Sequence, residues 1–377
     1  METNTPPKSG TSFLKTCFNG VNALSAICFY TGILLQRCID SSSLVKTYPD
    51  IGELAFGRKG RITVAAFMYL ELYLVAIDFL ILEGDNLEKL FPNASFFSSF
   101  HRIAGGTRQG FVLLFALLVL PTTWFRSLDL LAYVSLGGVL ASAILVASVL
   151  WVGAADGVGF REGGVAVRWG GVPTAMSLYA FCFSGHAVLL ICFIICTLAY
   201  GVMGVIGYLM YGGSLRSQVT LNLPARKLSS SIAIYTTLIN PFTKFALLIT
   251  PIAEAIEGVL GLGTATTGGK PAQYRAAAVS VSVRTALVVS TTAVALAVPF
   301  FAYVVALTGS FLSATATMLL PCACYLRISS RASGKLGVLE IVACVGDHRA
   351  WVRSDRDRHL QLAETDCAEL LIIYGQR

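Results

Sequence analysis

The sequence predicts an all-α polytopic membrane protein. Of its 377 residues, 55% are hydrophobic and only 13% are charged, and the mean hydropathy is +0.71. Soluble domains carry about a quarter charged residues, so a soluble core could not cover this much apolar surface. Two stretches, residues 169–215 and 285–326, contain no Asp, Glu, Lys or Arg. Each has about the length that two crossings of roughly 20 residues require.

Apolar runs in the first half predict four spans, at residues 13–36, 62–82, 110–125 and 130–152. The polar residues 38–60 are predicted as a linker with a turn at Tyr48-Pro49-Asp50, and residues 83–109 as a loop. Asn93-Ala-Ser95 in that loop matches a glycosylation acceptor, although so short a motif often matches by chance. Arg126 is expected in the tight turn between the last two of these spans.

A polar break interrupts the first uncharged stretch, where Ser184, Gly185 and His186 lie between apolar residues. Exposed backbone and a titratable ring at membrane depth are tolerated where they line a cavity. The break is therefore typical of a transporter. The alternative is that His186 is a hydrogen-bonded structural residue of an apolar helix.

The remaining apolar runs lie at residues 188–211, 231–253, 285–326 and 338–345. The run at 231–253 is predicted to be interrupted at Asn240-Pro241 and by Lys244, and residues 258–283 are predicted as a loop. The uncharged run 285–326 is predicted to form two spans that fold near residues 299–309, because it is about twice as long as the hydrocarbon is thick.

The chain is predicted to have three parts. Residues 1–12 are a polar N-terminal segment without the pattern of a cleaved signal peptide. Residues 13–345 form the transmembrane domain, and residues 346–377 form a charged tail without a membrane pattern.

Two carboxylates lie within a predicted span. Glu71 and Asp78 are seven residues apart and therefore share one face of their helix. A carboxylate in hydrocarbon costs about 2.5 kcal/mol or more, and desolvation disfavours its charged form. The pair is thus a candidate site for a proton or a substrate ammonium group. The alternative is an ion pair with Lys244, whose ammonium could instead bind a substrate carboxylate or extend to the membrane interface.

Other classes of function are excluded by the motifs. Most of the ten cysteines lie in apolar runs, as Cys322 and Cys324 do, and they are expected to be buried thiols and not zinc ligands. The Gly-rich residues 261–270 lack the pattern of a phosphate-binding loop. The net charge of +7 is spread over loops and forms no nucleic-acid patch. We therefore expect no enzyme activity, no cofactor, no metal and no nucleic-acid partner.

Several blocks of sequence resemble the amino acid/auxin permease family, in particular its plant vacuolar amino-acid transporters. They are Ser12-Phe-Leu-Lys-Thr-Cys-Phe-Asn-Gly-Val-Asn-Ala-Leu-Ser25, Phe29-Tyr-Thr-Gly32, Tyr48-Pro-Asp-Ile-Gly52, Phe183-Ser-Gly-His-Ala187, Asn240-Pro-Phe-Thr-Lys244 and Leu320-Pro-Cys322. The resemblance extends over roughly residues 12–345. It implies about eleven spans, a cytosolic N-terminus and a five-plus-five inverted repeat, in which the first and sixth helices are broken and substrate binds between them and the third and eighth.

The same resemblance implies the site residues. The candidate substrate-binding residues are Asn22 and Ser25 at the first break, Ser184, Gly185 and His186 on the sixth helix, and Asn240 and Thr243 on the eighth. Glu71, Asp78 and Lys244 are candidates for proton coupling or ion pairing. The function implied is proton-coupled transport of amino acids across the vacuolar membrane, with the plasma membrane or another endomembrane as the alternative.

The chain also departs from the family pattern at three points. After Ser25 it lacks the rest of the first helix and its connection, and after Val188 the seventh helix begins directly at Leu189. The last helix stops at Val345. We therefore expect 8–9 spans in place of about 11. The alternative function is a transport-impaired membrane protein that binds or regulates a partner through its tail.

Overall fold

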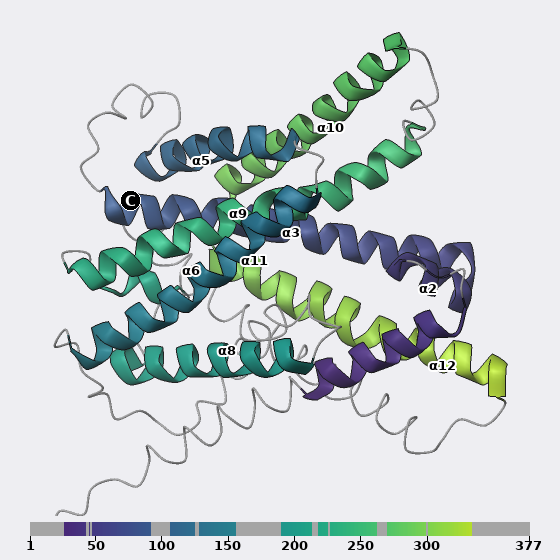
Figure 1. Ribbon diagram of the computed structural model, residues 1–377, viewed down its shortest axis with the longest axis horizontal. Coiled ribbons are helices and arrows are strands. Elements are labelled where there is room, and N and C mark those ends of the chain that lie inside the picture. The colour runs from purple at the N-terminus through teal and green to yellow at the C-terminus, as the bar shows by residue number, and fades with distance from the viewer. Residues whose placement is uncertain are drawn as a thin grey trace, which may run out of the picture. The chain divides into compact units, whose positions relative to one another are not determined.

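The computed structural model describes residues 26–42, 45, 47–91, 106–124, 128–155, 190–212, 218–224, 227–261, 270–298 and 301–333. All regular structure in these ranges is helical (Figure 1), which confirms the predicted all-α class. Residues 26–40 form the first helix. The helices that follow are α2 (Tyr48–Phe56), α3 (Arg58–Leu90), α5 (Thr107–Trp124), α6 (Leu128–Ala154), α8 (Leu190–Tyr211), η4 (Val219–Leu221), α9 (Leu228–Val259), α10 (Lys270–Ala297), α11 (Phe301–Leu307), η6 (Thr308–Ser313), η7 (Thr315–Leu319) and α12 (Leu320–Ser333).

Five helical segments of the described chain are long and apolar enough to span a membrane. They are Arg58–Leu90, Thr107–Trp124, Leu228–Val259, Tyr274–Ala297 and Val304–Ser330. The fourth lies within α10, and the fifth runs from α11 through η6 and η7 into α12. Two shorter apolar helical segments, Leu140–Ala154 and Thr197–Tyr211, fall within other predicted spans. The chain is therefore polytopic, as its composition predicts.

Two polar segments that the sequence predicts as non-helical are helical in the structure. The predicted turn at Tyr48-Pro49-Asp50 is the start of α2, where the Asp50 carboxylate accepts a hydrogen bond from the Thr47 N–H at 2.9 Å. Pro is favoured at this position because its missing N–H would be unpaired in any case. The predicted loop at 83–109 is also wrong at both of its ends, since α3 continues to Leu90 and α5 begins at Thr107.

The second half shows two similar differences. α9 runs without interruption through Pro241 and Pro251, so the polar residues that interrupt the apolar run 231–253 lie within one continuous helix, which extends beyond that run at both ends. α10 begins at Lys270, within the predicted loop 258–283. The stretch 285–326 is divided into two helical segments near residue 299, as predicted, because α10 ends at Ala297 and the next helix begins at Phe301.

The described helices belong to two compact units, with boundaries after Met68, Glu162, Gly204 and Val304, so that α3 begins in unit 1 and continues in unit 2. In unit 1, the helix 26–40, α2 and α12 pack together through Cys38, Ile51, Ala55 and Cys324. Cys322 and Cys324 are buried free thiols, as predicted.

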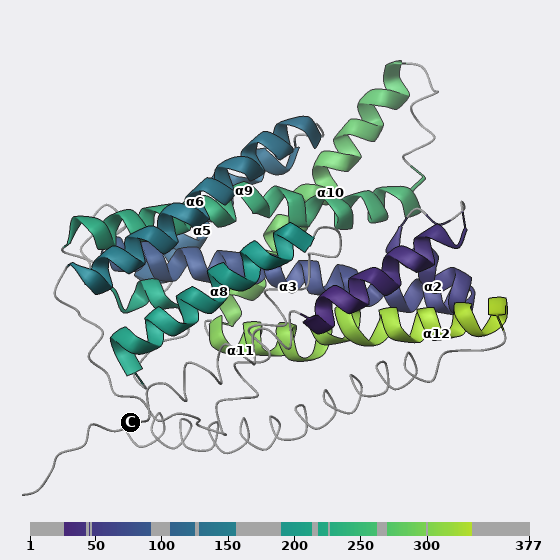
Figure 2. The ribbon, with the colours of Figure 1, turned by 60° about the horizontal axis from the view of Figure 1, so that its bottom comes forward.

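Unit 2 contains the remainder of α3 together with α5, α6, α9 and α10. α5, α9 and α10 pack against one another, and α6 packs along α9 (Figures 1 and 2). The core of this unit is apolar and includes Ile77, Leu80, Val112, Phe115, Phe245, Ile249 and Val288. The Phe115 ring meets the Phe245 ring edge-on, with centroids 6.5 Å apart, a geometry that adds about 0.5–1.5 kcal/mol to the burial of the two rings.

Candidate functional site

α9 carries three of the predicted site residues, Asn240, Thr243 and Lys244. Nδ2 of Asn240 donates to Oγ of Ser142 on α6 at 2.7 Å, whereas Oδ1 of Asn240 is buried without a hydrogen-bond partner among the described residues. Thr243 is buried, and its Oγ1 donates to the Asn240 carbonyl oxygen at 2.8 Å. Lys244 is half-buried.

Pro241 adds a second acceptor to this part of α9. Because proline has no N–H, the Thr237 carbonyl receives no helical hydrogen bond from position 241. That carbonyl and the Asn240 side-chain oxygen come from residues about one helical turn apart. Oxygen acceptors are the groups that an ammonium group requires, since it has three donors and no acceptor.

α3 carries the two predicted carboxylates, and both are buried. Asp78 is 1% exposed, and neither of its carboxylate oxygens has a hydrogen-bond partner in the described part of the chain. The alternative ion pair between Asp78 and Lys244 is therefore not formed. The neighbouring Ile77 belongs to the same core cluster as Phe245, which follows Lys244, so these segments of α3 and α9 lie against one core.

The other predicted site residues cannot be placed. Asn22, Ser25, Ser184, Gly185 and His186 all lie outside the described residues. The structure thus bears on the residues of the third and eighth helices only.

The sequence analysis missed a polar cluster at the C-terminal end of α3. Asp85 pairs with Nε of Arg108 on α5 and accepts a hydrogen bond from Nε2 of Gln218 at 3.2 Å. Asn86 donates to Oε1 of Gln218 at 3.3 Å and accepts from Oγ1 of Thr220 at 2.8 Å. Asp85 continues the seven-residue spacing of Glu71 and Asp78. That spacing is the sequence signal for this cluster, although the polar composition of residues 83–109 favours a loop.

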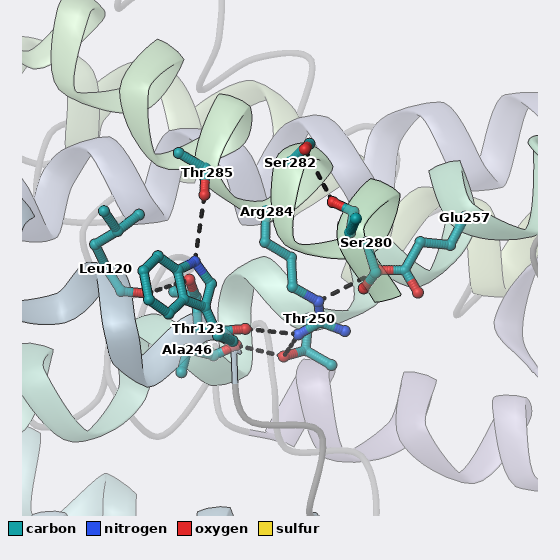
Figure 3. Close-up of polar contacts among 11 residues, drawn as sticks. Leu120, Thr123, Ala246, Thr250, Glu257, Ser280, Ser282, Arg284 and Thr285 are labelled. Carbon is teal, nitrogen blue, oxygen red and sulfur yellow. Dashed lines mark hydrogen bonds and ion pairs between the residues drawn. The ribbon is translucent and has the colours of Figure 1, made fainter. Parts of the chain in front are cut away.

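A second missed cluster joins α5, α9 and α10 around Arg284 (Figure 3). Arg284 is 1% exposed, and its Nε lies 3.3 Å from Oε1 of Glu257. Its Nη1 donates to the Thr123 carbonyl oxygen at 2.8 Å and to Oγ1 of Thr250 at 3.5 Å. Oγ of Ser280 donates to the same Glu257 oxygen at 2.6 Å. No local pattern indicates this cluster, because the sequence predicts Arg284 at the edge of a loop.

The Arg284 cluster also completes the end of α5. The last carbonyl groups of a helix have no helical partner, and Arg284 supplies a charged donor to the carbonyl of Thr123, one residue before the end of α5. Nε1 of Trp124 donates to Oγ1 of Thr285 at 3.2 Å (Figure 3), so α10 holds α5 at two successive residues.

The buried carboxylates therefore fall into two kinds. Asp85 and Glu257 are each paired with an arginine and hydrogen-bonded by a neutral side chain, so neither carboxylate is isolated from a partner. Asp78 has neither kind of partner among the described residues. A buried carboxylate without a partner is a candidate for binding a proton or a substrate group, because either removes the cost of its isolated charge.

Comparison with known proteins identifies the family. The family model for transmembrane amino acid transporter proteins matches residues 19–191 and 187–345. The chain belongs to this family. It is similar to amino acid transporter AVT1I of Arabidopsis thaliana, with 44% identity over 361 residues covering 84% of this chain and 86% of the relative. It is also similar to amino acid transporter AVT1J of the same plant, with 43% identity covering 86% of this chain and 85% of the relative.

The family match confirms the resemblance to the amino acid/auxin permeases and also bears on the departures from their pattern. The family model matches in two segments that meet at residues 187–191, where the sequence analysis noted that Leu189 follows Val188 directly. The alignment with AVT1I is 361 residues long, but it covers only 84% of the 377 residues of this chain. The alignment is longer than the part of this chain that it covers, so part of that relative lies opposite gaps in this chain.

Proposed function

We propose that the protein is a proton-coupled amino-acid transporter of the vacuolar membrane. Membership of a family of amino acid transporters supports the transport of amino acids. The observation that carries the proton coupling is the burial of Asp78 without a hydrogen-bond partner among the described residues.

The proposed coupling follows from the energy of the Asp78 carboxylate. An unpaired charge at membrane depth costs about 2.5–3.5 kcal/mol, and this cost disappears when Asp78 binds a proton and becomes a neutral hydrogen-bond donor. The acceptors on α9, Asn240 Oδ1 and the Thr237 carbonyl, are suited to the substrate ammonium group. A proton on Asp78 and a substrate at the α9 acceptors would then both favour one conformation of unit 2, in which the two are bound together.

The test is uptake of a labelled amino acid into proteoliposomes with an imposed proton gradient. Asp78→Asn keeps the size of the side chain but cannot release a proton. We expect it to abolish gradient-driven accumulation while keeping exchange of substrate across the membrane at equal pH. Glu254→Gln, which changes an exposed carboxyl of α9, is the matched control and should accumulate substrate normally. Gradient-driven accumulation by Asp78→Asn would contradict proton coupling through this residue.

The gaps in the alignments favour a second candidate function, a transport-impaired form that binds a partner. Uptake should be compared between this chain and a version with the relatives' segments inserted at Ser25–Ala26 and Val188–Leu189. Activity of the restored chain alone would favour the impaired form, and capture of a partner that depends on residues 346–377 would support its binding role. Absence of uptake by both chains would contradict the transporter proposal.

The vacuolar location rests on the resemblance to plant vacuolar transporters. A fluorescent fusion of the full chain is expected to label the vacuolar membrane of plant cells and to co-purify with isolated vacuoles. Labelling of the plasma membrane or of another endomembrane would contradict it.

A further inference from the structure

The junction of α2 and α3 forms a tight elbow in unit 1. Gly57 joins the two helices with a φ of 71°, a conformation that side chains with a Cβ rarely adopt. A Cβ built on Gly60 would overlap the Gly52 carbonyl oxygen, so the two helices touch backbone to backbone. Arg61 of α3 forms ion pairs with two carboxylates of α2. Its Nη1 lies 2.6 Å from Oε2 of Glu53, and its Nη2 lies 3.6 Å from Oδ1 of Asp50.

The elbow also carries apolar and cationic side chains that are exposed. Leu54, Phe56 and Ile62 are 37%, 49% and 60% exposed. Arg58 and Lys59 are exposed between them, and neither makes an ion pair within the described chain. Because Asp50 and Glu53 are engaged by Arg61, the elbow presents two cations beside three exposed apolar side chains.

The position of the elbow on α3 gives its depth in the membrane. The apolar part of α3 begins at Ile62, so Lys59 and Arg58 lie three and four residues, or about 5 and 6 Å, before it. The headgroup layer on each side of the hydrocarbon is about 5–7 Å thick. If α3 crosses the bilayer along its normal with Ile62 at the boundary of the acyl chains, the two cations reach the level of the lipid phosphates.

Further cations lie on the helices packed against α2. α12 packs against α2 and carries the exposed Arg327, and the helix 26–40 carries the exposed Arg37, whose Nη1 donates to the Tyr325 hydroxyl oxygen of α12 at 3.4 Å. Cations concentrate on the cytoplasmic side of membrane proteins, where the leaflet is rich in anionic lipid. The exposed cations Arg37, Arg58, Lys59 and Arg327 complement such a leaflet.

We propose that the elbow is a binding site for an anionic phospholipid. Arg58 and Lys59 bind the lipid phosphate groups, and Leu54, Phe56 and Ile62 pack against the upper acyl chains. Each basic residue near an anionic surface is worth about fivefold in binding. This site is separate from Asp78 and does not depend on proton coupling.

In the test, the purified full chain in a neutral detergent is titrated with a short-chain phosphatidylinositol phosphate. Native mass spectrometry counts the bound lipid. Short-chain phosphatidylcholine and free inositol phosphate are titrated in parallel. We expect the anionic lipid to bind, the neutral lipid to bind at least tenfold more weakly, and the free headgroup to bind more weakly than the intact lipid because it lacks acyl chains.

Two variants separate the charged from the apolar contribution. Arg58→Gln with Lys59→Gln should weaken binding of the anionic lipid by roughly 25-fold, about fivefold per charge, while the swap Arg58→Lys with Lys59→Arg should bind like the parent chain. Phe56→Ser should weaken binding of the intact lipid without changing that of free inositol phosphate.

Three results would overturn the proposal. They are parental binding by the doubly neutralised variant, equal binding of neutral and anionic lipids, and free inositol phosphate that binds as tightly as the lipid. Circular dichroism without lipid verifies that each variant is folded. If the doubly neutralised variant does not fold, unchanged lipid binding by Phe56→Ser would be sufficient to reject the site.

Discussion

At the scale of single residues, the partners of a buried charge decide what it can do. Asp78 and Glu257 are both carboxylates of long helices in unit 2, yet Asp78 has no hydrogen-bond partner in the described structure and Glu257 has an arginine and a serine. The first is suited to gaining and losing a proton. The second is suited to holding helices together, because its charge is stabilised by fixed donors.

Arg284 is expected to be a strong determinant of stability. Arg284→Met leaves Glu257 and the Thr123 carbonyl without their charged donor, and removal of one partner of a buried pair costs about 3–5 kcal/mol. We expect a clearly lower midpoint of thermal unfolding in detergent. The double variant Arg284→Met with Glu257→Leu should recover part of the loss, since no isolated charge remains. A single variant as stable as the parent chain would show that the pair has no structural role.

Gly60 gives a second prediction at this scale. In Gly60→Ala the new Cβ would meet the backbone of Gly52, which cannot move as a flexible side chain could. We expect a lower unfolding midpoint and greater proteolysis near α2. Gly258→Ala is the matched control, because a Cβ there meets nothing within 4 Å, and it should unfold like the parent chain.

At the scale of elements, α3 is longer than the membrane requires. α3 has 33 residues and is about 50 Å long, against a hydrocarbon thickness of about 30 Å. Its polar C-terminal turns remain helical because Asp85, Asn86 and Lys89 bind α5 and the segment 218–224. α5 is held in the same way at both ends, through Arg108 near its start and Thr123 near its finish.

Substitution of Pro241 tests whether the carbonyl that it frees on α9 binds substrate. Proline within a helix costs about 3 kcal/mol, so Pro241→Ala is expected to raise the unfolding midpoint by restoring a hydrogen bond to the Thr237 carbonyl. The same bond occupies a proposed substrate acceptor, and the KM for amino-acid uptake should rise. Pro251→Ala, which restores a bond elsewhere in α9, is the control for stability without an effect on KM. An unchanged KM in Pro241→Ala would contradict the role of this carbonyl.

At the scale of the molecule, unit 2 is joined by two polar clusters, one at Asp85–Arg108 and one at Glu257–Arg284. They share no residue, and sites without shared partners usually contribute additively to within about 0.5 kcal/mol. We expect the losses of stability in Arg108→Gln and Arg284→Gln to add in the double variant, as measured by urea unfolding in mixed micelles. Strong non-additivity would mean that the two ends of unit 2 are coupled.

The sequence by itself determined the class of the protein and most of its spans. An apolar run of about 20 residues is a local property, because transfer from water to lipid depends on the composition of the run itself. The Asn240-Pro241 block and the other matching blocks pointed to the family in the same local way. The resemblance also assigned Asp78 to the third helix of the family and Lys244 to the eighth.

Only the tertiary structure decided where the polar ends of the helices continue and which buried charges are paired. Residues 83–90 and 270–284 are too polar to be predicted as parts of spans, and they are helical in the structure, where Asp85 and Arg284 find partners on other helices. In the sequence, Asp85 and Arg108 are 23 residues apart, and Glu257 and Arg284 are 27 apart. Thr123 and Arg284 are 161 residues apart. No local pattern contains such separations, because a hydrogen bond depends on how helices pack.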